Sequence, residues 1–288
     1  MRRPLPAAAR AGLCLLLALL LAAAAAPWLE SALRVSAEQI DLSAMLLPPS
    51  AAHLLGTDDL GRDLLARLLR GGRVSLLVAL SAASLAALLG TLIGLVAGTH
   101  GGWADALLMR LTDGVIALPL LPLLIVLGAL DPAKLGLPPA LLGGAGAAAG
   151  RIIVIIALVG WTTVARLVRA AALSLKQQDF IRSAQALGLG PGRIMLRHIL
   201  PNTLPTLVVA ATLSVGNIML LESALSFLGL GIQPPLASWG TMLNGALQLL
   251  FTAPVLAVWP GAMIFLTVMA FNLLGDGLQQ RLDPRQRG

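Results

Sequence analysis

The segment AALSLKQQDFIRSAQALGLGPGRIMLRHILPN, residues 171–202, is the polar interruption around which the rest of this chain is organised. It lies between two apolar blocks, 152–170 and 203–222, which each hold enough largely uncharged residues to cross a bilayer as a helix. The segment itself carries too many charged and amide side chains to be a further span. It is therefore expected to lie outside the membrane, as the connection between two transmembrane helices.

Helix boundary signals divide this connection into two short helices. Asp179 can cap a first helix, which is expected to end near Leu187, and Gly188 then permits a left-handed turn. Pro191 fits the first turn of a second helix, and Pro201 is expected to end it. The pattern leaves open whether the apolar residues rest on lipid headgroups or dock into a groove on another protein. Those residues are Ile181, Ala184, Leu187, Ile194 and Leu196.

The composition of the whole chain is typical of an integral membrane protein. Of its 288 residues, 58% are hydrophobic and 11% are charged, whereas soluble domains have about 25% charged residues. This difference excludes a free-standing soluble enzyme and a disordered protein. The formal net charge is +7. The basic residues lie beside apolar blocks, which indicates membrane topology and contact with anionic lipid rather than binding of nucleic acid.

Six apolar blocks have the length of a membrane span. They cover residues 11–29, 74–98, 114–130, 152–170, 203–222 and 254–274. Because six is an even number, both termini are expected on the same side of the membrane. With the N-terminus in the cytoplasm, 13 of the 20 basic residues lie on the cytoplasmic side, as the positive-inside rule requires. The first block is longer than the core of a signal peptide and is expected to be retained.

The blocks divide the chain into three parts. Residues 1–72 hold the first helix and an extracytoplasmic segment, residues 73–275 form the transmembrane domain, and residues 276–288 form a cytoplasmic tail. Within the domain, Pro119 and Pro122 are expected to kink the third helix.

The polar connection resembles the cytoplasmic loop of binding-protein-dependent ABC importer permeases. The pattern of that loop is approximately E-A-A-x-x-x-G followed by I-x-x-x-H-x-L-P-N. The chain departs from this pattern at Arg182, where the family has Glu, and at Ser183, where it has Ala. These departures concern one polar contact and leave the turn unchanged. The matching residues are Ala184, Gly188, Ile194, His198, Leu200, Pro201 and Asn202.

Three further stretches, residues 53–80, 222–243 and 265–285, resemble the dipeptide, oligopeptide and nickel branch of this family. The resemblance implies the all-α, six-helix fold of a type-1 importer permease and the role of the second, C-type subunit in the bacterial inner membrane. It implies that a sister permease completes the pore and that two separate ATPase subunits hydrolyse ATP. An extracytoplasmic binding protein would deliver the solute, and the chain itself would have no catalytic residue and no cofactor.

The resemblance also implies that the polar connection couples the permease to its ATPase subunits. Neither of the two lysines, Lys134 and Lys176, lies in a phosphate-binding G-x-x-x-x-G-K-[ST] loop, so ATP is not expected to bind this chain. The solute stays open, because similar permeases carry dipeptides, longer peptides, nickel chelates and glutathione-like solutes. The residues expected to couple are Arg182, Ser183, Ala184, Leu187, Gly188, Ile194, His198, Pro201 and Asn202.

Polar residues within the spans are candidates for the pore or its gate. Glu222 lies 20 residues after Asn202, which places it near the outer boundary of the membrane. There it would belong to an outer gate or vestibule, or be an interfacial carboxylate exposed to water. Ser214, Asn217 and Asn272 could line a polar path, but packing between helices explains each of them equally well.

Two functions from other classes compete with the permease interpretation. An ion-coupled secondary transporter would need carboxylates near the bilayer midplane, and the six blocks supply none apart from Glu222. A magnesium-dependent transferase in the membrane could use the carboxylates of Asp58, Asp59 and Asp63. Arg62 interrupts that cluster, and capping of a short helix by Thr57 or Asp58 is the favoured explanation of these residues.

Overall fold

The computed structural model describes residues 6–130, 145–233 and 236–282. In these ranges the regular elements are helices, and one isolated β-bridge joins Thr57 to Asp63. The longer helices are α1 (Ala7–Leu33), α2 (Leu64–His100), α3 (Gly102–Ala117), α4 (Leu120–Ala129), α5 (Ala145–Lys176), α8 (Leu200–Phe227) and α10 (Val255–Leu282). The shorter ones are η1 (Leu42–Ala44), α6 (Asp179–Ala186), α7 (Pro191–Ile194), the π-helix η4 (Met195–Ile199), α9 (Trp239–Ala246) and η5 (Leu247–Leu249).

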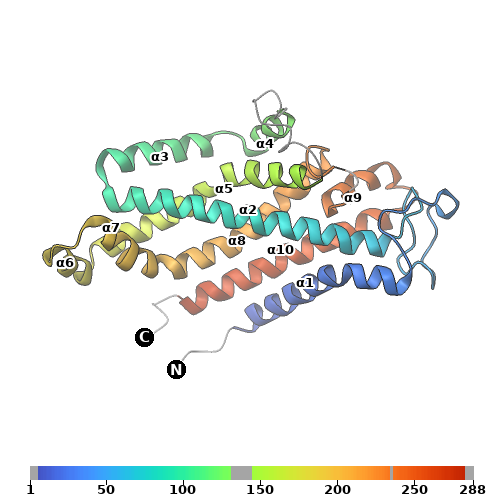
Figure 1. Ribbon diagram of the computed structural model, residues 1–288, viewed down its shortest axis with the longest axis horizontal. Coiled ribbons are helices and arrows are strands. Elements are labelled where there is room, and N and C mark those ends of the chain that lie inside the picture. The colour runs from blue at the N-terminus through green and yellow to red at the C-terminus, as the bar shows by residue number, and fades with distance from the viewer. Residues whose placement is uncertain (1–5, 131–144, 234–235, 283–288) are drawn as a thin grey trace.

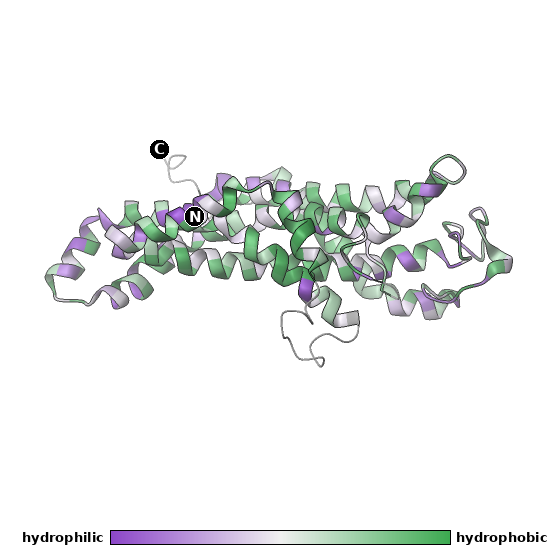
Figure 2. Cartoon of the chain, turned by 90° about the horizontal axis from the view of Figure 1, so that it is seen from above, coloured by the Kyte–Doolittle hydropathy of each residue, from purple (hydrophilic) through white to green (hydrophobic). Residues whose placement is uncertain are grey.

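Within the described residues, five stretches of helix are long and apolar enough to cross a membrane. They are α1, α2, α5, the continuous helix formed by α7, η4 and α8, and α10, while α3 and α4 together would make a sixth span. The long helices lie side by side along one axis (Figure 1). Hydrophilic residues gather at the two ends of the bundle, around α6 and α7 at one end and between α1 and α2 at the other (Figure 2). The predicted all-α membrane fold is confirmed.

The region of the third predicted span differs from the expectation of one kinked helix at 114–130. Two helices, α3 and α4, meet there at an angle of 89°. The break has a local cause. Leu118 precedes a proline, whose ring would clash with Leu118 in an α-helical conformation, so Leu118 takes up an extended conformation (ψ 137°). Pro119 then serves as the N-cap of α4. The helix before the break begins at Gly102, where Gly101, with φ +69°, separates it from the end of α2.

Glycines bring α2 and α5 into close contact at the centre of the bundle. Gly90, Gly94 and Gly98 follow one another at intervals of four residues, so they share one face of α2. A Cβ atom added to Gly90 or Gly94 would lie 2.5 Å from a backbone carbonyl oxygen of α5, that of Trp161 or Ala165 respectively. Small residues at this spacing let two membrane helices approach to backbone contact. The pair α2–α5 therefore forms the rigid centre on which the functional elements are mounted.

Candidate functional site

The helix–turn–helix expected in the polar connection is present at the end of the bundle (Figure 1). Gly188 takes up the expected left-handed conformation, with φ +79°. Two details differ. Asp179 is the first residue of α6 and makes no capping bond, because Gln178 occupies the N-cap position. At the N-terminus of the helix its carboxylate still interacts favourably with the helix dipole.

Pro201 does not end the second helix, which corrects the prediction. The chain passes from α7 through the π-helix η4 into α8 without interruption, and the backbone N–H of Leu200 donates to the carbonyl oxygen of Met195, five residues earlier. A proline within a regular α-helix clashes with the carbonyl four residues before it. The wider π-turn gives the ring the room that it needs. As a result, the tip of the connection is continuous with a membrane-spanning helix.

The inner face of the helix–turn–helix packs against the ends of the long helices. Ile181, Ala184 and Ile194 are at most 6% exposed and share a hydrophobic cluster with Val168 and Ala172 of α5. Neither lipid headgroups nor another protein is needed to bury these three residues, because their partner lies within the same chain. The connection is therefore anchored to α5 and is positioned to move with it.

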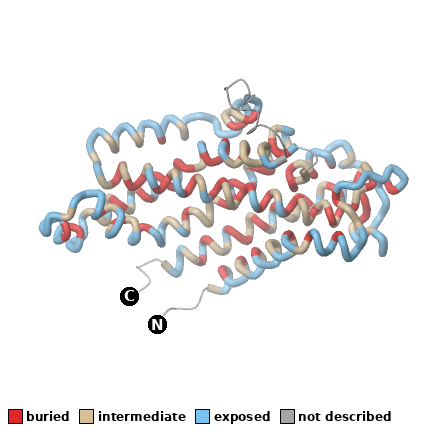
Figure 3. The backbone as a smooth tube through the Cα atoms, in the orientation of Figure 1, coloured by how far each residue is buried: buried red, intermediate tan, exposed pale blue. Residues whose placement is uncertain are grey.

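The outer face of the helix–turn–helix is exposed (Figure 3). The side chain of Arg182 is 68% exposed, and Leu187 is 80% exposed. Phe180 and Leu196 are also exposed apolar residues of the helix–turn–helix, and Phe180 was not singled out in the sequence. The face combines apolar side chains with a guanidinium, which suits it to bind a groove on another protein. Among the other predicted coupling residues, Ser183, Gly188, Pro201 and Asn202 are exposed and His198 is half-buried.

A cavity of about 460 Å³ lies where α5 and α8 meet the break between α3 and α4. Two residues predicted for the pore, Ser214 and Asn217, line it together with Thr162 and Thr163 of α5. Among the described lining residues the others are apolar or glycine, and none is charged. Asn217 is exposed, so the cavity opens at the surface of the bundle. The two threonines were missed because the sequence does not show which face of α5 lies toward α8.

Asn272 does not join the other predicted pore residues in the cavity. It is an exposed residue of α10, and its side chain lies beside α8, where a Cβ atom added to Gly216 would be 3.4 Å from the amide oxygen Oδ1. The structure thus brings together two of the three uncharged residues predicted for the pore and leaves Asn272 outside it.

Glu222 is fully buried, so the expectation of a water-exposed interfacial carboxylate is wrong. Its Oε2 accepts hydrogen bonds from the hydroxyls of Ser75 on α2 (3.2 Å) and Ser223 (3.4 Å), and its Oε1 accepts one from Ser226 (2.8 Å). The Ser75 hydroxyl also accepts a hydrogen bond from the backbone N–H of Trp239, at the start of α9 (3.1 Å). The carboxylate therefore connects α2, α8 and α9, and the serines that surround it were not singled out in the sequence.

Replacing Glu222 with alanine is expected to lower the free energy of unfolding by about 2–4 kcal/mol, because it leaves buried hydroxyls without their acceptor and opens a void. Glu222→Gln, which keeps a carbonyl oxygen for Ser226, serves as the matched control and is expected to lose about 1 kcal/mol or less. The thermal unfolding midpoints of the two purified variants in detergent measure the difference. Equal midpoints for alanine and glutamine would contradict this role of the carboxylate.

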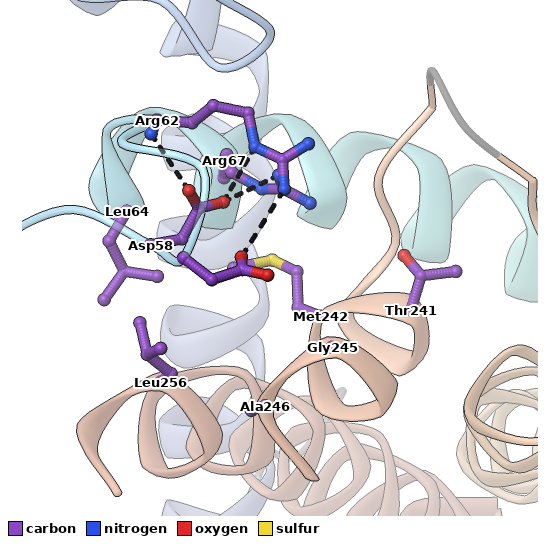
Figure 4. A pocket seen from close by; sticks show the side chains of 10 residues that line it. Asp58, Arg62, Leu64, Arg67, Thr241, Met242, Gly245, Ala246 and Leu256 are labelled. Atoms are coloured by element: carbon purple, nitrogen blue, oxygen red, sulfur yellow. Dashed lines mark hydrogen bonds and ion pairs between the residues drawn. The ribbon is translucent and has the colours of Figure 1, made fainter. Parts of the chain in front are cut away.

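In the acidic cluster of Asp58, Asp59 and Asp63, the carboxylate of Asp58 already accepts hydrogen bonds from neighbouring groups of the chain (Figure 4). Asp58 accepts hydrogen bonds from the backbone N–H groups of Leu60 and Arg62 at 2.9 Å, and from the guanidinium groups of Arg62 and Arg67 at 2.8 Å. Four donors fill the lone pairs of one carboxylate, so Asp58 is not available to magnesium. The prediction that Thr57 or Asp58 caps the helix is also wrong, because Asp63 caps α2, the Thr57 hydroxyl donates to the carbonyl oxygen of Ala44, and Asp58 organises the loop. In the described part of the chain, no group of three or more His, Cys, Asp or Glu residues is arranged to hold a metal ion.

Comparison with known proteins relates this architecture to transport. Residues 90–288 match the family model described as "Binding-protein-dependent transport system inner membrane component". A putative peptide permease protein of Brucella suis biovar 1 (strain 1330) is 42% identical over 277 residues, which cover 95% of this chain and 86% of that protein. The dipeptide transport system permease protein DppC of Alkalihalophilus pseudofirmus is 40% identical, with 96% of this chain and 85% of that protein covered. The nickel transport system permease protein NikC of Escherichia coli K12 is 39% identical, with 86% and 84% covered.

A solved structure shares the fold. It is an inward-facing form of the MetNI methionine ABC transporter, and one of its chains aligns with a TM-score of 0.58 at 20% identity, over 75% of this chain and 97% of that chain. The helical bundle, the helix–turn–helix and the family match agree with one another. The chain therefore belongs to the family of inner membrane components of binding-protein-dependent transport systems, and it is a permease subunit of an ABC importer rather than an enzyme.

Proposed function

We propose that this chain forms half of a pore through which a peptide or a related small solute enters the cell. The cavity between α5, α8 and the α3–α4 break would be its part of the pathway, and a second permease subunit would close the open side. The hydroxyls of Thr162, Thr163 and Ser214 and the amide of Asn217 offer neutral hydrogen-bonding groups to a peptide backbone. Neutral groups suit a pathway from which the solute must also leave. The relatives named as peptide and dipeptide permeases support this solute class.

The observation that carries the proposal is the helix–turn–helix of α6 and α7. It is anchored by Ile181, Ala184 and Ile194 on the bundle, while Leu187 and Arg182 remain exposed at its tip. We infer that this tip docks into a groove on an ATPase subunit. Closure of two ATPase subunits around ATP would then move α6 and α7, and with them α5 and α8, which continue directly from the connection.

The orientation of the chain follows from this assignment. The first turn of α1 and the last turn of α10 lie toward the end of the bundle that carries α6 and α7 (Figure 1), so this end and both termini would be cytoplasmic in the bacterial inner membrane. The opposite end, with the segment between α1 and α2 and with α9, would face the extracytoplasmic binding protein that delivers the solute. The complete importer would then contain this chain, a second permease subunit, two ATPase subunits and the binding protein.

Uptake into proteoliposomes tests the proposal. Vesicles that contain both permeases and both ATPase subunits are loaded with ATP and supplied with the binding protein and labelled di- and oligopeptides. We expect uptake that requires both ATP and the binding protein, and that exceeds the uptake of labelled nickel or glutathione. Uptake by this chain alone, driven by an ion gradient without ATP, would contradict the proposal and favour a secondary transporter.

A further inference from the structure

The helix α3 has few apolar contacts with the bundle. All of its residues are described, and Thr112 alone is buried. Trp103, Leu107 and Leu111 are more than half exposed, and α3 runs along the outside of the bundle (Figure 3). Burial of apolar surface therefore contributes little to holding α3 in place, and its position depends on other contacts.

Two ion pairs join α3 to α5. Asp105 and Arg169 form a bidentate pair, with 2.5 Å between Oδ1 and Nε and 2.6 Å between Oδ2 and Nη2. Eight residues further along α3, Asp113 pairs with Arg166. The side chains of Asp105 and Arg169 are 18% and 33% exposed, whereas those of the second pair are at least half exposed. Shielding from water and the two parallel bonds make the first pair the stronger and more directional one.

The shielded pair lies between the connection and the cavity. Arg169 precedes the C-terminus of α5 at Lys176 by two turns, and α6 begins three residues after that lysine. On the other side, Asp105 belongs to the helix whose last turn contributes Val115 and Ile116 to the lining of the cavity. One continuous route thus runs from α6 through α5, across the ion pair, and along α3 to the wall of the cavity.

We propose that the Asp105–Arg169 pair is the link that makes α3 follow α5 when the ATPase subunits move the connection. The inference rests on the function proposed above and names the positioning residues of its coupling step. A planar guanidinium held by both carboxylate oxygens fixes orientation as well as distance, so rotation and translation of α5 both reach α3. Without this pair, the more exposed Asp113–Arg166 pair still joins the two helices, but the α3 wall of the cavity follows the movement of α5 less closely.

The test measures solute transported per ATP hydrolysed in the reconstituted four-subunit importer with its binding protein. Asp105→Asn and Arg169→Gln are each expected to lower this ratio about tenfold, which corresponds to about 1.4 kcal/mol and lies within the range of interaction energies between contacting residues, while ATP hydrolysis continues. The exchanged double variant, Asp105→Arg with Arg169→Asp, is expected to recover most of the ratio. Asp276→Asn changes an exposed carboxylate on α10, a helix that packs against α1, α8 and α9, and is the matched control.

The outcomes separate this inference from the proposed function. If the wild-type importer shows no ATP-dependent uptake, the proposed function fails. If the wild type transports and Asp105→Asn has the same ratio, the inference fails and the proposed function stands. A variant that lowers the amount of assembled importer but keeps the ratio per assembled complex would assign the pair a structural role only, which also overturns the inference. The inference is also overturned if the exchanged double variant transports no more solute per ATP hydrolysed than the single variants do.

Discussion

Replacing Gly188 with proline is expected to reduce ATP hydrolysis stimulated by the binding protein at least about tenfold, while the chain still inserts into the membrane. Gly188 has φ +79°, and its backbone N–H donates a hydrogen bond to the carbonyl oxygen of Gln185 (2.9 Å). Proline fixes φ near about −65° and has no N–H, so the turn between α6 and α7 has to take another path. The exposed tip then no longer presents Leu187 and Arg182 in the arrangement that docks.

Two control variants isolate the effect of the backbone conformation. Asparagine tolerates the left-handed region better than other residues with a side chain, and nothing lies within 4 Å of a Cβ atom at Gly188, so Gly188→Asn is expected to keep most of the stimulation. Gly192 also has open space around its Cβ position but no positive φ, and Gly192→Ala is expected to behave as the wild type. Full stimulation in Gly188→Pro, measured in assembled complexes, would count against the coupling role of this turn.

Replacing Gly94 with leucine is expected to have the largest effect on the folded chain. A Cβ atom there would lie 2.5 Å from the carbonyl oxygen of Ala165 and 2.9 Å from Cβ of Val168. These neighbours are the backbone and the first side-chain atom of α5, which cannot move aside as the end of a flexible side chain can. Overpacking costs about 1–3 kcal/mol and occasionally more, and we expect a value at the upper end because α2 and α5 have to separate.

Gly261→Leu on α10 is the matched control for Gly94→Leu, because nothing lies within 4 Å of its Cβ position. The measurement is the amount of monodisperse protein recovered in mild detergent and its thermal unfolding midpoint. We expect several-fold lower recovery and a lower midpoint for Gly94→Leu, and values near the wild type for Gly261→Leu. Similar recovery and midpoints for both variants would show that the contact between α2 and α5 is not decisive.

Local signals in the sequence predicted much of the fold. Each apolar block predicts a span from its own length and composition. The turn at Gly188 was predictable because few residues other than glycine adopt a positive φ. Predictions from single residues failed where the structure around the residue changes its effect. Pro201 stays within a helix because the π-turn before it makes room, and the two aspartates of α3 are paired with arginines on α5, which no local pattern indicates.

The parts of the candidate site that depend on distant contacts were not predictable. Ser75 lies 147 residues from Glu222 in the sequence, and no local pattern indicates that the two meet. The spacing of Glu222 and Ser226, one helical turn apart, is a signal that could have indicated a buried hydrogen bond. The four-residue interval of Gly90, Gly94 and Gly98 is a similar signal for helix contact. The face of α5 that carries Thr162 toward the cavity became evident only from the packing of α8.

Purification of the tagged chain from its native membrane in mild detergent tests whether this chain is one subunit of an ATP-driven importer. Mass spectrometry then identifies the proteins that accompany it. The predicted result is a complex with a second permease and two ATPase subunits, and with a binding protein whose solute can be determined. A solitary chain that still moves solute under an ion gradient would show instead that the protein is a secondary transporter.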